Sequence, residues 1–134
     1  MTLNDQAAAP DAITFMVVDD DSIVVHSLAR ALRALGKVAF SSEFDRVHIA
    51  AASALPRIML IDIDLPSVTG IEIARRIRSN PELDSVYILM MTAHRSEAVL
   101  KQVEGLKADG LIEKPVDIPA LLVRVQGMLQ QVRS

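Results

Sequence analysis

Five polar side chains, far apart along the chain, have the residue types of a phosphoryl-transfer site. Each of them follows an apolar run, and they are Asp19, Asp20, Asp62, Thr92 and Lys114. Three carboxylates brought together repel one another and raise one another's pKa, so they need a cation. Oxygen ligands without cysteine suit Mg²⁺. An ammonium and a hydroxyl beside one carboxylate suit a phosphoryl group, which aspartate can carry as an acyl phosphate.

The elements that must position these residues are short apolar runs alternating with helical patterns. Strands are expected within residues 13–18, 37–40, 57–61, 85–91 and 109–114. Helical periodicity falls within residues 22–35, 44–54, 71–77, 99–106 and 118–132. Five such units predict an α/β fold: a doubly wound, flavodoxin-like parallel sheet with helices on both faces. The common strand order for this arrangement is 2-1-3-4-5.

That strand order brings the five polar residues to one rim. Ligands of such sheets bind beyond the carboxyl ends of the strands, where the winding reverses between strands 1 and 3. Asp62 is therefore expected at the mouth of this crevice, facing the other acids, rather than buried. Asp21 has a simpler interpretation as a helix cap. Pro66 and Gly70 are typical loop residues, since proline fixes a turn and glycine tolerates unusual backbone angles.

Length and composition restrict the class of protein. A chain of 134 residues, 51% hydrophobic and 23% charged, has the size and composition of one globular domain. The net charge of −3, from 14 basic and 17 acidic residues, argues against direct nucleic-acid binding by this domain. No signal peptide, membrane-spanning run or cysteine is present, so a cytoplasmic location is expected. Residues 1–12 are expected to be a flexible N-terminal leader.

Four short motifs together resemble the receiver domain of two-component response regulators. They are VVDDD at 17–21, DIDLPSVTG at 62–70, MTA at 91–93 and KP at 114–115. Each motif alone is weak, but all four occur in order, each at the end of the expected strand. The resemblance covers residues 13–132, which we take as the receiver domain.

The resemblance implies a phosphoacceptor and a magnesium site. Asp62 would be the phosphoacceptor and one ligand of Mg²⁺. Asp20 would bind the ion directly and Asp19 through water. The backbone carbonyl of Asp64 would be a further ligand. Whether the Asp64 side chain points to water or adds negative charge beside the incoming phosphoryl group is left open by the sequence.

The same resemblance implies how the phosphoryl group is held. The Thr92 hydroxyl and the Ala93 amide would bind its oxygens, and Lys114 would pair with it. The peptide bond between Lys114 and Pro115 is commonly cis in such domains. Leu111 stands where many receivers carry an aromatic switch residue, so the usual threonine–aromatic switch is not expected here.

The implied role is a phosphorylation-dependent signalling switch rather than an enzyme with an external substrate. The donor would be the phosphohistidine of a sensor histidine kinase or a phosphotransfer protein. Phosphorylation would alter the surface formed by the helix at 99–106, the strand at 109–114 and the last helix. A C-terminal output domain or a separate downstream protein would read that surface, and no membrane contact is implied.

Three alternative functions fit parts of the sequence less well. One is a phosphatase in which Asp62 and Asp64 form a D-x-D motif, but that motif normally follows the first strand. Another is a receiver-like interaction module that is not regulated by phosphorylation, although Asp62 and Lys114 are both present. A flavin-binding relative of the same fold is disfavoured further, because acids after the first strand repel a phosphate.

Overall fold

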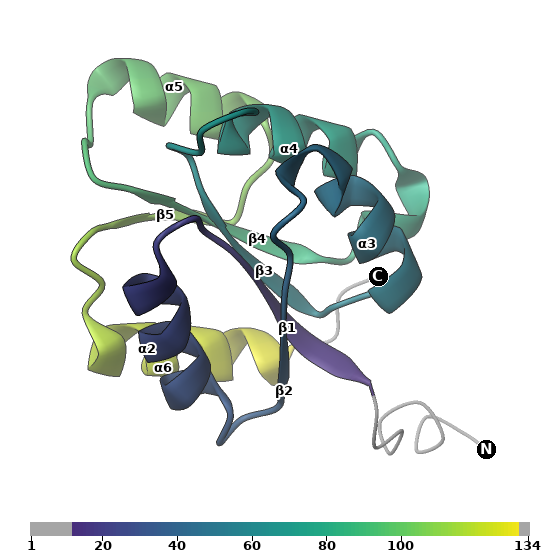
Figure 1. The fold of residues 1–134 in the computed structure, drawn as a ribbon, viewed down its shortest axis with the longest axis vertical. Coiled ribbons are helices and arrows are strands. Elements are labelled where there is room, and N and C mark those ends of the chain that lie inside the picture. Colours follow the sequence, from purple (N-terminus) through teal and green to yellow (C-terminus); the bar gives the residue numbers. More distant parts are fainter. Residues whose placement is uncertain (1–11, 132–134) are drawn as a thin grey trace.

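A computed structural model describes residues 12–131 as a parallel sheet between two helical layers (Figure 1). The strands are β1 (Ile13–Val18), β2 (Lys37–Phe40), β3 (Ile58–Asp62), β4 (Tyr87–Thr92) and β5 (Gly110–Glu113). The helices are α2 (Ser22–Leu32), α3 (Val47–Ala54), α4 (Gly70–Arg78), α5 (Glu97–Gly105) and α6 (Ile118–Leu129), with short 3-10 helices η1 (Phe44–Arg46) and η2 (Pro81–Leu83). The expected leader, apart from Ala12, lies outside the described residues.

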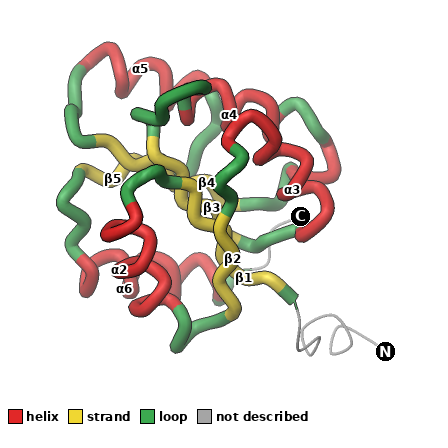
Figure 2. Tube along the Cα trace, viewed as in Figure 1, coloured by secondary structure: helices red, strands yellow, loops and turns green. Residues whose placement is uncertain are grey.

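The sheet has the predicted order β2-β1-β3-β4-β5, and its neighbouring strands pair in parallel. β1 and β3 are adjacent, with Phe15 opposite Ile58 and Val18 opposite Ile61. Helices α2 and α6 cover one face of the sheet, and α3, α4 and α5 cover the other (Figures 1 and 2). The order 2-1-3-4-5 therefore places the carboxyl ends of β1 and β3 side by side, at the reversal of winding.

Strand residues alternate between two hydrophobic clusters, one on each face of the sheet. In β3, Met59 and Ile61 pack in the cluster beneath α3, α4 and α5, whereas Ile58 and Leu60 pack beneath α2 and α6. This alternation follows from the two-residue period of a strand. Because both faces are covered, the central strand β3 is apolar up to its last residue, Asp62, as expected for a parallel sheet.

Most element boundaries differ from the sequence expectation by one to three residues, and for α2 and β4 the structure shows the local cause. Helix α2 ends at Leu32 instead of reaching Leu35, because the chain turns there and the Leu35 amide donates to the Leu32 carbonyl. Strand β4 begins at Tyr87 rather than at residue 85, because the turn of η2 continues until the Val86 amide donates to the Leu83 carbonyl. No helix within residues 12–131 is long and apolar enough to cross a membrane.

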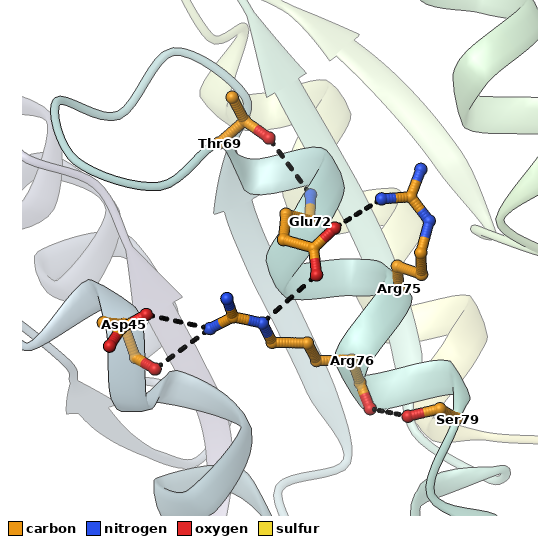
Figure 3. Close-up of polar contacts among 6 residues, drawn as sticks. All are labelled: Asp45, Thr69, Glu72, Arg75, Arg76 and Ser79. Atoms are coloured by element: carbon orange, nitrogen blue, oxygen red, sulfur yellow. Dashed lines mark hydrogen bonds and ion pairs between the residues drawn. The ribbon is translucent and has the colours of Figure 1, made fainter.

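Helix α4 carries a polar network that links it to the chain ahead of α3 (Figure 3). The Thr69 hydroxyl caps the helix by accepting from the Glu72 amide at 3.1 Å. The Arg76 guanidinium donates to Glu72 and, at 3.1 Å, to both the carbonyl and the carboxylate of Asp45. These bonds fix α4 against η1. α4 also follows the loop that begins at Asp62, so its position helps to define the rim of the sheet.

Candidate functional site

The carboxylates of Asp19, Asp20 and Asp62 converge at the carboxyl ends of β1 and β3. One oxygen from each lies within 4.8 Å of the others. Among the described residues, this is the group of acids and histidines whose arrangement suits a metal ion. The neighbouring Asp21 caps α2 by accepting from the amides of Ile23 and Val24, as its position predicted.

Lys114, which follows β5, reaches into this acidic cluster. Its ammonium lies 2.7 Å from Oδ2 of Asp19 and 3.4 Å from Oδ2 of Asp62. The remaining oxygens Oδ1 of these two acids accept backbone amides, from Asp21 at 2.9 Å and from Asp64 at 3.2 Å. The Asp20 carboxylate has no hydrogen bond or ion pair within residues 12–131, and it is exposed.

Asp62 is more buried than the sequence suggested. It was expected at the mouth of the crevice, but only 3% of its surface is exposed. The burial is possible because the amide of Asp64 and the ammonium of Lys114 both contact its carboxylate. A buried charge is tolerated only with such partners.

The electrostatic environment favours an additional cation. Burial, together with the negative charge of Asp19, raises the pKa of Asp62, and the Asp64 amide and Lys114 offset this only in part. Burial acts to lower the pKa of Lys114, but the bonds and charges of Asp19 and Asp62 outweigh it and raise that pKa. Three carboxylates and one ammonium leave two negative charges, which one divalent ion would neutralise. The site therefore fits Mg²⁺ in both charge and ligand type.

The end of β4 supplies the remaining predicted side chain. Thr92 is buried, and its hydroxyl lies in a turn with His94: it donates to the His94 carbonyl at 3.2 Å and accepts from the His94 amide at 3.0 Å. Ala93 follows at the exposed surface. The Lys114–Pro115 peptide bond is cis, as the resemblance implied. The structure thus places Thr92 at the end of β4, Ala93 directly after it, and Lys114 directly after the neighbouring strand β5, at the same edge of the sheet.

Asp64 and Leu111, the two remaining predicted positions, do not place their side chains in the acidic cluster. The side chain of Asp64 is exposed, so only its backbone contacts the Asp62 carboxylate. Leu111 is half-buried and packs against the cluster beneath α3, α4 and α5. The single tyrosine, Tyr87, lies at the opposite end of the sheet, where its hydroxyl donates to Gln131. Position 111 itself therefore carries a leucine, and the tyrosine of the chain lies elsewhere in the sheet.

Gly70 allows the backbone that carries Asp62 to fold tightly against α4. A Cβ atom at Gly70 would lie 2.1 Å from the carbonyl oxygen of Asp62 and 2.8 Å from the Cα of Ile63. Both are backbone atoms that cannot rotate away. The Gly70 amide also donates to the Ile63 carbonyl at 3.0 Å. Absence of a side chain, rather than an unusual φ, is the reason for glycine here.

We therefore predict that Gly70→Ala lowers the free energy of unfolding by about 1 to 3 kcal/mol, because the Asp62 backbone must shift. Urea unfolding followed by circular dichroism measures this. Gly105→Ala is the matched control, since a Cβ there meets no atom within 4 Å. Equal stabilities of the two variants would contradict the proposed close approach.

Comparison with known proteins agrees with this geometry. A family model described as the response regulator receiver domain matches residues 15–126. The chain therefore belongs to the receiver domain family of two-component response regulators. It is similar to the phosphate regulon transcriptional regulatory protein PhoB of Rhizobium meliloti, with 35% identity over 120 residues, covering 87% of this chain and 52% of the relative. It is also similar to the response regulator MprA of Mycobacterium bovis, with 32% identity, covering 91% of this chain and 53% of the relative.

Solved structures show the same fold. A putative response regulator from Chloroflexus aurantiacus matches with a TM-score of 0.80 and 26% identity, covering 90% of this chain and all of that one. The chemotaxis protein CheY4 of Vibrio cholerae matches with a TM-score of 0.80 and 22% identity, covering 87% and 98%. The chain spans about half the length of the curated relatives that it matches. Family membership, with the D-x-D motif on β3 rather than on the first strand, leaves no support for the phosphatase alternative.

Proposed function

We propose that this domain is a phosphorylation-dependent switch in which Asp62 accepts a phosphoryl group from a phosphohistidine. The observation that supports this most directly is the convergence of Asp19, Asp20, Asp62 and Lys114 at one rim. A purely structural cluster would not require three acids around one lysine with two negative charges left over. The donor would be a sensor histidine kinase or a phosphotransfer protein.

The proposed reaction is a transfer between nucleophiles. An Asp62 carboxylate oxygen attacks phosphorus, the bond from phosphorus to the imidazole nitrogen breaks, and the electron pair returns to the ring. An acyl phosphate forms on Asp62. Lys114, already 3.4 Å from Oδ2 of Asp62, would neutralise charge on the phosphoryl oxygens. Mg²⁺ bound by Asp20, Asp62, the Asp64 carbonyl and, through water, Asp19 would supply further charge neutralisation.

Binding of the phosphoryl group by Thr92 would require a change in its hydrogen bonds. Its hydroxyl now donates to the His94 carbonyl, and a hydroxyl has one proton to donate. If the Thr92 hydroxyl donated to a phosphoryl oxygen instead, its hydrogen bond to the His94 carbonyl would break. The turn after β4 could then change conformation, and the Ala93 amide could bind the same phosphoryl group. We infer that this turn couples phosphorylation to the surface of α5, β5 and α6 without an aromatic residue at Leu111. Amide chemical shifts that stay unchanged there after phosphorylation would contradict this inference.

The test of the proposal uses a small phosphodonor, such as acetyl phosphate, with Mg²⁺. We expect the intact mass of the protein to rise by one phosphoryl group. Excess chelator is expected to reduce the phosphorylated fraction to background, because the uncompensated acids would repel the anionic donor. Restoring free Mg²⁺ should restore the modification in the same sample.

A different outcome would support the remaining alternative. If no phosphoryl group is added with Mg²⁺ and a fresh donor, the domain is better described as a receiver-like interaction module. Addition that persists in chelator would contradict the role of the acidic cluster. We place the functional domain at residues 13–132, in the cytoplasm, and expect its output to be a further domain or a separate downstream protein.

A further inference from the structure

Helix α3 presents apolar side chains to solvent at the edge of its helical layer. Ile49 is 49% exposed, and Leu55, directly after the helix, is 56% exposed. Ala52 is also exposed and lies midway between them in the sequence. Neither Ile49 nor Leu55 packs in or against the two core clusters. We call Ile49, Ala52 and Leu55 the α3 stripe. The helix lies beside α4 and away from α5 and α6 (Figures 1 and 2).

Leu55 has a backbone conformation that glycine adopts with less strain. Its φ of 50° and ψ of 57° are left-handed, and its amide closes α3 by donating to the Ala51 carbonyl at 2.8 Å. Glycine or asparagine is the usual residue at such a helix end. Because more than half of the leucine side chain is exposed, packing within this domain does not account for it. A contact with another molecule would account for it.

The α3 stripe lies in an uncharged segment. Residues 47–56 contain no aspartate, glutamate, lysine or arginine, and their one histidine, His48, is half-buried. Each of the other four α-helices that the structure describes carries at least one charged side chain. The start of α3 is held by the hydrogen bonds of Arg76 to Asp45 in the preceding turn (Figure 3). The stripe is therefore neutral and held in a defined position.

The α3 stripe is complementary to itself. Ile49 and Leu55 lie three positions before and after Ala52, which is about 4.5 Å along the helix in each direction. If two copies packed antiparallel about a two-fold axis at Ala52, each Ile49 would meet the partner's Leu55. The small alanine side chains at the centre would let the two backbones approach closely. Such reciprocal contacts define a symmetric interface, and a neutral surface can face its own copy without charge repulsion.

We propose that the α3 stripe binds the α3 stripe of a second copy of this chain. Three residues from each copy bury far less area than the roughly 1,600 Å² of a standard interface, so the dimer is weak, with a dissociation constant on the order of 0.1 mM. This contact leaves the acidic cluster and the surface of α5, β5 and α6 uncovered. It does not depend on phosphorylation.

The first test is sedimentation equilibrium of the full chain without a phosphodonor, over concentrations that span the expected dissociation constant. Ala52→Arg would place two like charges at the two-fold axis, so we expect dimerisation to weaken by about tenfold or more. Ala98→Arg is the matched control at an exposed position of α5, and its dissociation constant should stay within about twofold of the wild type. A monomeric wild type throughout the series would overturn the proposal and indicate another kind of partner. Equal dissociation constants for Ala52→Arg and the wild type would also overturn it.

A second test uses the absence of cysteine from the chain. Ala52→Cys places one thiol at the proposed two-fold axis, where two copies bring their thiols together, and Ala98→Cys is the control. With diamide as the oxidant, we expect the disulfide-linked dimer of Ala52→Cys to form at least about tenfold faster than that of the control. Equal rates of crosslinking would contradict the proposed contact.

Leu55→Asn tests the leucine itself, because asparagine tolerates the left-handed backbone and removes the apolar contact. We expect dimerisation to weaken by about tenfold. The midpoint of urea unfolding, measured on dilute monomeric protein, should equal or exceed that of the wild type. A lower midpoint would assign Leu55 to the stability of the single domain and overturn the proposal. Failure of phosphoryl transfer would leave all three results unchanged and count against the proposed function alone.

Discussion

Asp62→Asn is expected to abolish phosphoryl acceptance while leaving the fold intact. The amide of asparagine is a poor nucleophile and cannot form the acyl phosphate. It also fits the space of the carboxylate and can still accept from the Asp64 amide, which lies 3.2 Å from Oδ1. Intact mass after treatment with acetyl phosphate and Mg²⁺ should show no added phosphoryl group.

Asp84→Asn is the control for this experiment. It makes the same chemical change at an exposed residue that caps η2 and lies away from the acidic cluster. We expect this variant to accept one phosphoryl group like the wild type. If Asp62→Asn still gained a phosphoryl group in full, the assignment of the acceptor would be wrong.

Arg78→Met is expected to produce the largest loss of stability outside the core. The Arg78 guanidinium pairs with Asp109 at 3.1 Å, with side-chain exposures of only 11% and 18%. It also donates to three backbone carbonyls, those of Leu83, Val86 and Lys107. One side chain thus joins the end of α4 to the starts of β4 and β5. Removing it leaves partly buried acceptors with fewer donors, and the partly buried Asp109 carboxylate loses this cation.

We predict a decrease of about 2 to 4 kcal/mol in the free energy of unfolding for Arg78→Met, measured by urea unfolding with circular dichroism. Arg75→Met, one turn earlier on α4, is the control. The Arg75 side chain is 60% exposed and pairs with Glu72 (Figure 3), its one ion-pair partner within residues 12–131, so the predicted change is about 0.5 kcal/mol or less. A loss for Arg78→Met no larger than that of the control would show that this partly buried pair contributes little to stability.

The sheet was predictable from the sequence because its signal is local. The first two strands, 13–18 and 37–40, have the predicted bounds, and both apolar faces of β3 follow from its uninterrupted run of hydrophobic residues. The strand order followed from the number of alternating units, and the order then brought Asp62 to Asp19 and Asp20. The hydrophobic pattern of the strands and the strand order of the sheet therefore predict the same fold.

The side-chain hydrogen bonds and ion pairs that connect distant helices and strands were not predictable from the sequence. The Arg57 guanidinium caps α6 by donating to the Leu129 carbonyl at 2.8 Å, and Tyr87 reaches Gln131 at 2.9 Å. Arg78 and Asp109 likewise pair across 31 positions. An exposed arginine and a partly buried arginine with several hydrogen-bond partners look the same in a sequence, because the difference lies in partners supplied by distant segments. The degree to which Asp62 is buried was missed for the same reason.

The most direct test of the central claim is to identify the modified residue itself. An acyl phosphate on aspartate is reduced by borohydride to the alcohol, so Asp62 would become homoserine. The protein is phosphorylated with Mg²⁺, reduced, digested and sequenced by mass spectrometry. The account predicts homoserine at position 62, in the peptide containing the DIDLPSVTG motif, and none in the sample treated with chelator. Homoserine at another aspartate, or phosphate retained on a serine, threonine or histidine with position 62 unchanged, would contradict it.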